Sequence, residues 1–393
     1  MSDKEFQKNS NVNETDKKKK HCFQVMSGKD IQMSEDTQED FLVDGLITPG
    51  LNILAAPRKK GKSWFALDLA LCISGGKDFW GRKTKHGKVL LFALEDTMQR
   101  LKIRINEQLD YEDAPDDLLV SYATEAYGDE FYKDLDDYLT ENPDIIFVIV
   151  DVMQKIRSDK KSNETEYSHD YRDVGHLKKI ADSHKISLLV ITHTRKTEDK
   201  KDRLNEIAGG VGVTGVADTI LMICGNRSMD SEQTLYITGR DIQENELVIA
   251  FDKDFCKWLC KGNKEELNVK KDEEVYASSP IVKVIKALME KNGGKWIGTS
   301  RELLEYGLKE MGEPIAKSES ALARKINRFD ECFLKDSIGH QRPDPNGGFA
   351  GRKHIFIRID KDNHPPKAGK GVETIDFDYS GFADSMMIPM EEE

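Results

Sequence analysis

The sequence has no long apolar run. No stretch approaches the ~20 consecutive apolar residues that a membrane-spanning helix needs, and the positive charges near the N-terminus are not followed by the apolar segment of a secretion signal. These absences argue against a membrane protein and against a secreted one. We therefore expect a cytoplasmic protein that has no membrane partner.

Cysteine is scarce and scattered. The 393 residues include six cysteines, too few for the dense disulfide framework of a small secreted domain. Cys256 and Cys260 have a spacing that zinc can use, but no second Cys/His pair follows at a suitable distance. We expect free thiols.

The chain also lacks an excess of positive charge. Its formal net charge is −12, which argues against a protein coated in nucleic acid, although clustered Lys and Arg can still form local basic surfaces. The composition, 38% hydrophobic and 33% charged, is that of a soluble globular protein with polar appendages.

The pattern of residues changes along the chain, whose length suits about two to three domains. Residues 1–38 are polar, contain the run Lys17–Lys20 and have few large apolar side chains. Such a segment cannot bury enough surface to fold alone, so we expect a disordered arm. A solvated arm is favoured over one that contacts nucleic acid.

Residues 39–260 alternate short apolar runs with helical patterns, as a mostly parallel sheet with crossover helices does. Runs such as Ile145–Val150 and Leu188–Ile191 are continuously apolar, which strands covered on both faces require. The expected fold class is therefore α/β. The predicted strands are Leu51–Ala55, Lys88–Leu94, Ile145–Asp151, Ile186–Thr192, Thr219–Cys224, Thr234–Gly239 and Leu247–Phe251.

The remainder of the chain reads differently. Residues 261–279 are expected to be a polar linker. Within residues 280–360, Pro280 marks a helix start, two further helical segments follow at 300–308 and 318–329, and a strand covers His354–Ile359. Three helices closed by a β-hairpin describe a winged-helix domain.

Residues 361–393 are expected to be a disordered acidic tail with large apolar side chains interspersed, among them Phe377, Tyr379 and Phe382. Such a segment can dock in the groove of a partner, for example a replication protein, or lie on the DNA channel of its own protein. An inert solubilising tail is an equally good interpretation.

The octapeptide Ala56-Pro57-Arg58-Lys59-Lys60-Gly61-Lys62-Ser63 matches a phosphate-binding P-loop. A predicted strand precedes it and an apolar helix beginning at Trp64 follows, so we expect the backbone from Ala56 to Trp64 to surround the phosphates of ATP. Lys62 would supply the cation and Ser63 the hydroxyl that binds Mg²⁺. Ala56 stands where the usual pattern has its first glycine, a change that this position tolerates at negative φ.

Two carboxylates at strand ends are candidates for the chemistry. Asp151 ends the apolar run Ile145–Val150 and is expected to complete the Mg²⁺ shell with Ser63. Glu95 follows another predicted strand, where a carboxylate can orient and deprotonate the attacking water. We choose Glu95 over Asp96 because Asp96-Thr97 has the pattern of a helix cap.

Together these motifs resemble those of RepA-type replicative helicases and their relatives in plasmids, phages and integrative elements, which belong to the RecA/DnaB-like ring ATPases. The resemblance covers roughly residues 41–254. The motifs that carry it are Ala56–Ser63, Leu94–Asp96, Val150-Asp151, Thr192–Lys196, Gly209–Asp218 and Gly239–Asp241.

The resemblance implies a homo-oligomeric ring, a hexamer, that binds ATP between subunits. His193 resembles the sensor that connects the γ-phosphate to DNA-binding loops. Arg240 resembles the arginine finger that reaches the γ-phosphate bound by the neighbouring subunit. Thr238 departs from the family pattern, in which a lysine stands two residues before this arginine. Ordinary surface positions are the alternative for both His193 and Arg240.

Two regions are candidates for nucleic-acid contacts. In the family that the chain resembles, the loops after the strand ending at Asp151 and after His193 line the central channel. The first loop spans residues 157–172, and the basic side chains of the second are Arg195, Lys196, Lys200, Lys201 and Arg203. Both loops also carry acids, so a plain solvated loop is nearly as good an interpretation.

The predicted winged helix is the second region. Its segment 318–329 carries Arg324, Lys325 and Arg328, which can face the phosphates of DNA. Winged helices also dock proteins, so this alternative stays open.

The sequence therefore predicts an ATP-hydrolysing, Mg²⁺-dependent motor that acts on single-stranded DNA as a replicative ring helicase. Its catalytic residues would be Lys62, Glu95, Asp151, His193 and Arg240. Two alternatives stay open: a recombination or repair ATPase of the same class, which forms filaments or remodels DNA, and a nucleotide-gated regulator whose winged helix binds duplex DNA.

Overall fold

The computed structural model describes residues 25–34, 41–195, 203–208, 211–225, 228–342 and 353–359. The chain divides into two compact units, an N-terminal unit of Met1–Asn245 with Ala250–Leu259 and a C-terminal unit of Glu246–Ile249 with Cys260–Glu393. Each unit has a hydrophobic core of its own. Within the described ranges, no helix is both long enough and apolar enough to cross a bilayer.

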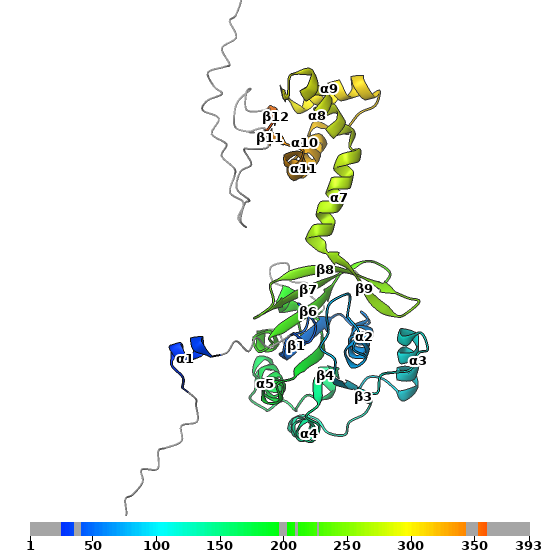
Figure 1. Cartoon of the computed structure of the whole chain (residues 1–393), viewed down its shortest axis with the longest axis vertical. Helices are drawn as coiled ribbons and strands as arrows, with labels where there is room; N and C mark the ends of the chain where they lie inside the picture. Colours follow the sequence, from blue (N-terminus) through cyan, green and yellow to red (C-terminus); the bar gives the residue numbers. More distant parts are fainter. Residues whose placement is uncertain are drawn as a thin grey trace, which may run out of the picture. The chain divides into compact units, whose positions relative to one another are not determined.

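A nine-stranded sheet of order β3-β2-β4-β5-β1-β6-β7-β8-β9 dominates the N-terminal unit (Figure 1). The strands from β3 to β6 in this order are parallel, and β7 is antiparallel to β6. The strands are β1 (Gly50–Ala56), β2 (Lys88–Ala93), β3 (Leu118–Ser121), β4 (Ile145–Asp151), β5 (Ser187–His193), β6 (Thr219–Cys224), β7 (Gln233–Gly239), β8 (Asn245–Asp252) and β9 (Lys257–Asn263).

Helices cover both faces of this sheet, α2 and α3 on one side and α4 and α5 on the other (Figure 1). The main helices are α2 (Lys62–Ser74), α3 (Met98–Leu109), α4 (Asp129–Glu141) and α5 (Glu166–His184), and the short ones are α1 (Gly28–Met33), η1 (Met153–Lys155), η2 (Arg203–Glu206) and α6 (Val211–Thr214). Because the central strands are covered on both sides, β1 is buried along its whole length. The apolar faces of α4 and α5 pack on the strands through Phe131, Leu135 and Leu177.

This mostly parallel core confirms the predicted α/β fold class. All seven predicted strands are present, and their ends differ from the prediction by at most two residues. Strands β3 and β9 lie outside the prediction. The first has only four residues, all of them half-buried, and the second carries Lys257, Lys261 and Gly262, which hide its alternation.

The C-terminal unit contains five helices and a three-stranded antiparallel sheet of order β10-β12-β11 among its described residues. The elements are α7 (Lys264–Ser278), α8 (Pro280–Lys291), β10 (Lys295–Gly298), α9 (Ser300–Met311), α10 (Glu319–Arg328), α11 (Asp330–Lys335), β11 (Ile338–Gln341) and β12 (His354–Arg358). Helices α8, α9 and α10 begin at or next to the predicted positions. The winged helix itself stays a prediction, since residues 343–352 of its hairpin lie outside the described ranges.

Residues 261–279, expected to be a polar linker, are mostly helix. Asn263 caps α7, because its side-chain oxygen accepts hydrogen bonds from the N–H groups of Glu265 and Glu266. These two acids also stand in the first turn, where the helix dipole favours negative charge. The helix therefore forms although the polar composition of residues 261–279 is typical of a linker.

Asp218 fixes the start of β1, the strand that leads into the P-loop. Its buried carboxylate accepts a hydrogen bond from the Leu51 N–H at 2.8 Å and lies 2.8 Å from the Lys178 ammonium on α5. Arg240, directly after β7, approaches the same carboxylate at 3.4 Å. One buried charge thus joins β1, α5 and the end of β7. Removing it would leave buried donors without their acceptor charge.

We expect Asp218→Asn to lower the free energy of unfolding by about 2 kcal/mol, because asparagine keeps the shape but removes the charge that Lys178 and Arg240 face. Urea denaturation followed by circular dichroism measures this loss. Asp182→Asn is the matched control, because Asp182 is the other, more exposed carboxylate bound to Lys178, and its loss should cost less than about 0.5 kcal/mol. Equal losses for the two variants would contradict the role of Asp218.

Candidate nucleotide-binding site

The predicted nucleotide residues meet at one edge of the sheet. Because β1, β2, β4 and β5 are parallel, their carboxyl ends lie side by side. Ala56 at the end of β1 pairs with His193 at the end of β5, and Ala93 at the end of β2 pairs with Asp151 at the end of β4. This edge is where parallel α/β sheets hold ligands.

The P-loop turns from β1 into α2 through two left-handed residues. Lys59 has φ 61°, and Gly61, the N-cap of α2, has φ 68°. No side chain caps the helix, so the N–H groups of its first turn are available to an anion. A helix N-terminus of this kind is a phosphate-binding element. Gly61 suits its position because glycine adopts positive φ without strain.

Lys62, the first residue of α2, has a buried side chain whose ammonium contacts neutral acceptors. It donates hydrogen bonds to the carbonyls of Ala56 (2.9 Å) and Pro57 (3.0 Å) and lies 3.0 Å from His193 Nδ1. Burial lowers the pKa of Lys62 to about 8, although the charges of Asp151 and Glu95 act in the opposite direction. A bound phosphate would supply the anionic partner that this ammonium lacks.

Asp151 and Ser63 form the candidate Mg²⁺ site. The Ser63 hydroxyl donates a hydrogen bond to the Asp151 carboxylate, whose pKa burial raises to about 6. Hard oxygen donors of these two types are those that Mg²⁺ prefers. The raised pKa shows that the positive charges nearby do not fully compensate the buried carboxylate, so a bound cation would stabilise its ionised form. These residues therefore fit Mg²⁺, which would be held by Ser63, Asp151 and phosphate oxygens and would offset phosphate charge.

The structure gives Glu95 and Asp96 different surroundings. Asp96 forms ion pairs with Arg100 at 3.0 Å and with Arg104, both on α3. Glu95 is exposed, and its carboxylate forms no hydrogen bond or ion pair with any residue that the structure describes. Its charge nevertheless acts on Lys62, Asp151 and His193 through their pKa values. Glu95 is thus the carboxylate with freedom to act on a water.

His193 is half-buried at the end of β5, beside the P-loop. Burial, followed by the charges of Lys62 and Arg58, lowers its pKa, so the imidazole is neutral near pH 7. Its backbone carbonyl accepts a hydrogen bond from the Ala208 N–H at 2.9 Å. The residue therefore touches the P-loop lysine on one side and the segment after β5 on the other.

Residues 22–199 match a family model described as an AAA domain. The matched segment contains the P-loop, Glu95, Asp151 and His193, on the parallel strands described above. This part of the chain is therefore similar to an AAA domain, and it places the P-loop at the carboxyl ends of parallel strands.

Among solved structures, the chain is similar to one described as an ATPase domain and to one described as a DnaB-like replicative helicase and its interactions with primase. Each match has 16% sequence identity, a TM-score of 0.45 and covers 59% of this chain. The matches span 94% of the first chain and 66% of the second, just under two thirds of its length. No curated protein matches the sequence.

Within the N-terminal unit, Lys60 and Lys62 contact different partners, Gln233 and His193. The Lys60 side chain is only 1% exposed, and its ammonium donates a 2.7 Å hydrogen bond to Gln233 Oε1 at the start of β7. Burial lowers the pKa of Lys60. Arg58 and Lys59 are exposed on the same loop. Lys60 therefore anchors the back of the loop, whereas Lys62 occupies its phosphate side.

Strand β9 and the turn before it contact the P-loop and helix α2. The indole N–H of the buried Trp258 donates to the Gly61 carbonyl at 3.1 Å, and Lys257 lies 3.6 Å from Asp68 on α2. Gln108 of α3 donates to the carbonyls of Trp64 and Cys256. Sequence reasoning missed Gln233 and Trp258, since no motif or spacing connects them with P-loop residues 173 and 197 positions earlier.

Trp64 is engaged in packing rather than turned to the phosphates. The Arg104 guanidinium lies 4.9 Å from the centre of its ring, and the Phe251 ring packs against it at 6.4 Å. The side chain of Trp64 is therefore held by packing, and its part in nucleotide binding stays a prediction.

Arg240 and the P-loop lie at opposite ends of the strands. Arg240 lies near the beginning of β1, and the P-loop follows the end of β1. The Arg240 N–H donates to the Asp218 carbonyl, and its guanidinium contacts the Asp218 carboxylate and the Gly215 carbonyl. The side chain is 57% exposed. Since β1 runs from this end of the sheet to the P-loop, Arg240 is remote from the P-loop of its own chain, and its predicted role stays a prediction.

The nucleic-acid candidates are only partly described. Lys196, Lys200 and Lys201 lie outside the described residues. Arg195 is exposed, and its N–H donates to the Glu206 carbonyl at 2.6 Å. Arg203 lies over the Tyr236 ring, 5.6 Å from its centre. These two positions stay predictions.

In the loop of residues 157–172, the arginines are turned inward. Arg157 binds Asp170 and lies 3.6 Å from Asp173, and Arg172 binds Glu164 at 2.8 Å. This buried ion network holds the loop to α5, so its arginines are committed to structure. In the C-terminal unit, Arg328 is paired with Asp272, while Arg324 and Lys325 are exposed on α10.

We expect Lys62→Met to weaken binding of MgATP by at least about 100-fold, because a charge-assisted contact to phosphate is lost. Lys60→Met, two residues earlier, should change affinity by less than about threefold, because that ammonium binds Gln233 on the far side of the loop. Fluorescence titration with a labelled ATP analogue measures both affinities, and a large loss in Lys60→Met would contradict this division of roles.

Asp68 predicts a pH dependence of stability. Burial raises its pKa to about 6 despite Lys257, so the folded protein binds this proton more tightly than the unfolded chain does. The resulting stabilisation is complete below the ordinary Asp pKa and is lost as the pH rises through about 6. Relative to Asp68→Asn, the wild type should lose about 1 kcal/mol of unfolding free energy between pH 5 and pH 7.5. Urea denaturation at both pH values measures the difference, and a constant difference would contradict the burial argument.

Proposed function

We propose that the protein is a DNA-stimulated, Mg²⁺-dependent ATPase motor that works as a replicative ring helicase on single-stranded DNA. The observation that carries the proposal is the contact between Lys62 and His193 Nδ1. This contact connects Lys62, which is proposed to bind the γ-phosphate, with His193 at the end of β5. The chain after β5 leads away from the nucleotide site.

The connection works by competition for Lys62. A γ-phosphate at the N-terminus of α2 offers the ammonium a charged partner in place of the neutral imidazole, so His193 is released. Beyond His193, Thr194 forms a bridge with Ile207, and two backbone hydrogen bonds join Arg195 to Glu206 and Ala208 to His193. A shift of His193 therefore moves residues 203–208 as one piece. After hydrolysis and phosphate release, Lys62 returns to His193.

Glu95 is proposed to orient the attacking water, since its exposed carboxylate lies next to the charges of Lys62 and Asp151 and carries no other bond among the described residues. Arg240 is proposed to complete the site of the adjacent subunit by stabilising transition-state charge. Its exposed position on the opposite sheet edge supports this role. In a closed ring, proposed to be a hexamer, every nucleotide site has a neighbouring subunit that supplies its Arg240.

Single-stranded DNA is proposed to bind where the segment after β5 meets the start of α5. Tyr167 and Tyr171 on α5 stack on each other with ring centres 6.1 Å apart, and both are 51% exposed. The backbone around them lies against Gly212 of α6. Exposed aromatic rings stack on bases without regard to sequence, and Arg195 and the lysines nearby in the sequence offer charge to the backbone.

A mixing experiment tests the shared site. Lys62→Ala and Arg240→Ala should each lower single-strand-stimulated ATP hydrolysis to background. Mixed in equal amounts, the two variants should recover roughly a quarter of wild-type activity, because an intact P-loop then meets an intact Arg240 in some interfaces. Steady-state phosphate release with and without single-stranded DNA is the measurement.

The control is Arg301→Ala, which removes an exposed arginine of the C-terminal unit and should leave hydrolysis unchanged. Failure of the mixture to recover would contradict a site completed by Arg240 of a neighbour. Slow hydrolysis indifferent to single strands, with tight binding to one duplex sequence, would replace the motor by a nucleotide-gated regulator. Stimulated hydrolysis with filaments in electron micrographs and no unwinding of forked DNA would favour the recombination ATPase.

A further inference from the structure

Strand β3 ends the central sheet on the side away from β9 and has a paired neighbour, β2, on one side only within the described chain. The Asp117 carbonyl accepts a hydrogen bond from the Val89 N–H. In a parallel ladder this places the backbone groups of Leu119 and Ser121 toward β2 and those of Val120 away from it. The N–H and C=O of Val120 therefore face outward, as they do in an edge strand that can accept another strand.

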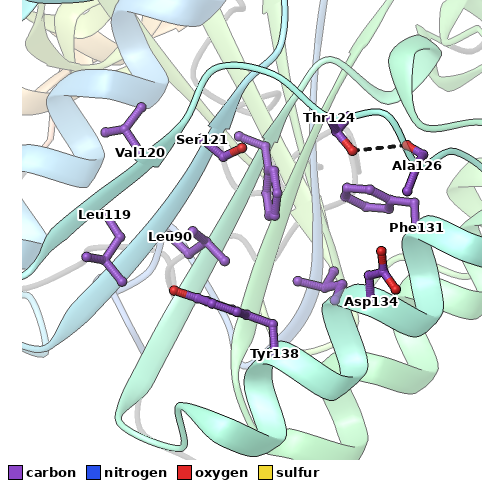
Figure 2. Close-up of a pocket in the computed structure, with 11 residues that line it drawn as sticks. Leu90, Leu119, Val120, Ser121, Thr124, Ala126, Phe131, Asp134 and Tyr138 are labelled. Carbon is purple, nitrogen blue, oxygen red and sulfur yellow. Dashed lines mark hydrogen bonds between the residues drawn. The ribbon is translucent and has the colours of Figure 1, made fainter.

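A cavity of about 440 Å³ lies beside this edge on the face covered by α4 (Figure 2). Leu90, Leu119 and Phe131 line its apolar part, and Tyr138 stands at its rim. Asp134 is the charged residue among the groups that line it. Figure 2 shows the Phe131 and Tyr138 rings of α4 facing the side chains of β2 and β3 across this space.

A second cavity, of about 300 Å³, lies beside the same edge on the face covered by α3. Val120 and Tyr122 line it together with Leu101 and Ile105. Lys102 is the charged residue of its lining. The free edge is thus flanked by two hollows on opposite faces, one with a carboxylate and one with an ammonium. A strand added here would place alternate side chains in the two hollows.

The C-terminal tail contains a segment with the matching alternation. In Ile375-Asp376-Phe377-Asp378-Tyr379 (the tail segment), large apolar side chains occupy every second position and aspartates occupy the positions between them. We propose that the tail segment adds to the free edge of β3 as a further strand. Ile375, Phe377 and Tyr379 then enter the cavity beside α4, and the two aspartates face α3.

Charge decides which face of the tail segment goes where. In the arrangement proposed, Asp376 and Asp378 meet Lys102, and the Tyr379 hydroxyl is available to Asp134. In the reverse arrangement the aspartates would meet Asp134 on the strongly acidic helix α4, and like charges at that distance repel. Backbone pairing with β3 supplies the affinity for the tail segment, and the two cavities fix its register against β3.

The occupant also has to offer free backbone groups, because the edge of β3 presents backbone N–H and C=O groups. Helix α1 also exposes apolar side chains, Ile31 and Met33 among them, but it is helical and does not supply free backbone groups to a sheet edge. The tail segment is therefore the occupant that fits the edge as well as the cavity.

Hydrogen exchange of the full-length protein tests the proposal. In wild type, the amides in a peptide covering residues 117–123 should exchange at least about tenfold more slowly than in Phe377→Asp, which places a charge in the apolar cavity. Phe382→Asp, a matched change in the same tail outside the tail segment, should keep the slow exchange. Equal exchange in wild type and Phe377→Asp would overturn the proposal.

Binding in trans gives a second measurement that does not depend on exchange. A fluorescein-labelled peptide of residues 372–382 should bind the full-length Phe377→Asp protein, and a peptide of the same composition with its alternation scrambled should not. Lys102→Glu in the receptor should weaken binding about fivefold, and a peptide with Asp376→Lys and Asp378→Lys should restore it. Affinity insensitive to both the scrambling and Lys102→Glu, or displacement of the peptide by one of residues 25–34, would overturn the proposal.

Discussion

The P-loop side of the N-terminal unit depends on a buried ammonium that has only neutral partners. Lys62 is bound by two backbone carbonyls and an imidazole, while the nearest carboxylates act on it from a distance. A cation in these surroundings gains free energy when an anion arrives, because the cost of its burial is already present before binding. In the proposed cycle the same arrangement makes His193 sensitive to the nucleotide, since the contact that His193 loses is the one that the phosphate gains.

Holding that ammonium in place requires support from distant parts of the chain. Asp218 fixes the beginning of β1, Gln233 binds Lys60 behind the loop, and Trp258 binds the Gly61 carbonyl. The strand before the P-loop is thus held at its beginning, and the loop itself is held at Lys60 and at Gly61. A loop fixed in this way keeps its N–H groups aimed at one point, which is how preorganised donors favour a bound anion. The P-loop and Arg240 lie at opposite ends of these strands, the P-loop where β1 ends and Arg240 where β1 begins.

Much of this was within reach of sequence reasoning because it depends on local order. A continuous apolar strand, a P-loop and an apolar helix predict a phosphate site whatever the rest of the chain does. Parallel strands then bring Glu95, Asp151 and His193 to the same edge, since every carboxyl end of a parallel sheet faces one way. Helix α7 was harder, because a charged composition describes linkers and exposed helices equally well, and only the Asn263 cap distinguishes them. Strand β3 was harder still, because four half-buried residues carry too little periodicity.

The sequence by itself determined the fold class, the nucleotide loop and the kinds of side chain at its edge, because strand periodicity and loop chemistry act over a few neighbouring residues. Only the tertiary structure decided which lysine of the loop faces the phosphate side, which of two adjacent carboxylates is free, and that Arg157 and Arg172 serve a buried ion network. Those outcomes depend on partners far away in the chain, such as Gln233 for Lys60 and α3 for Asp96. Burial and charge pairing are properties of the assembled fold, and no local pattern records them.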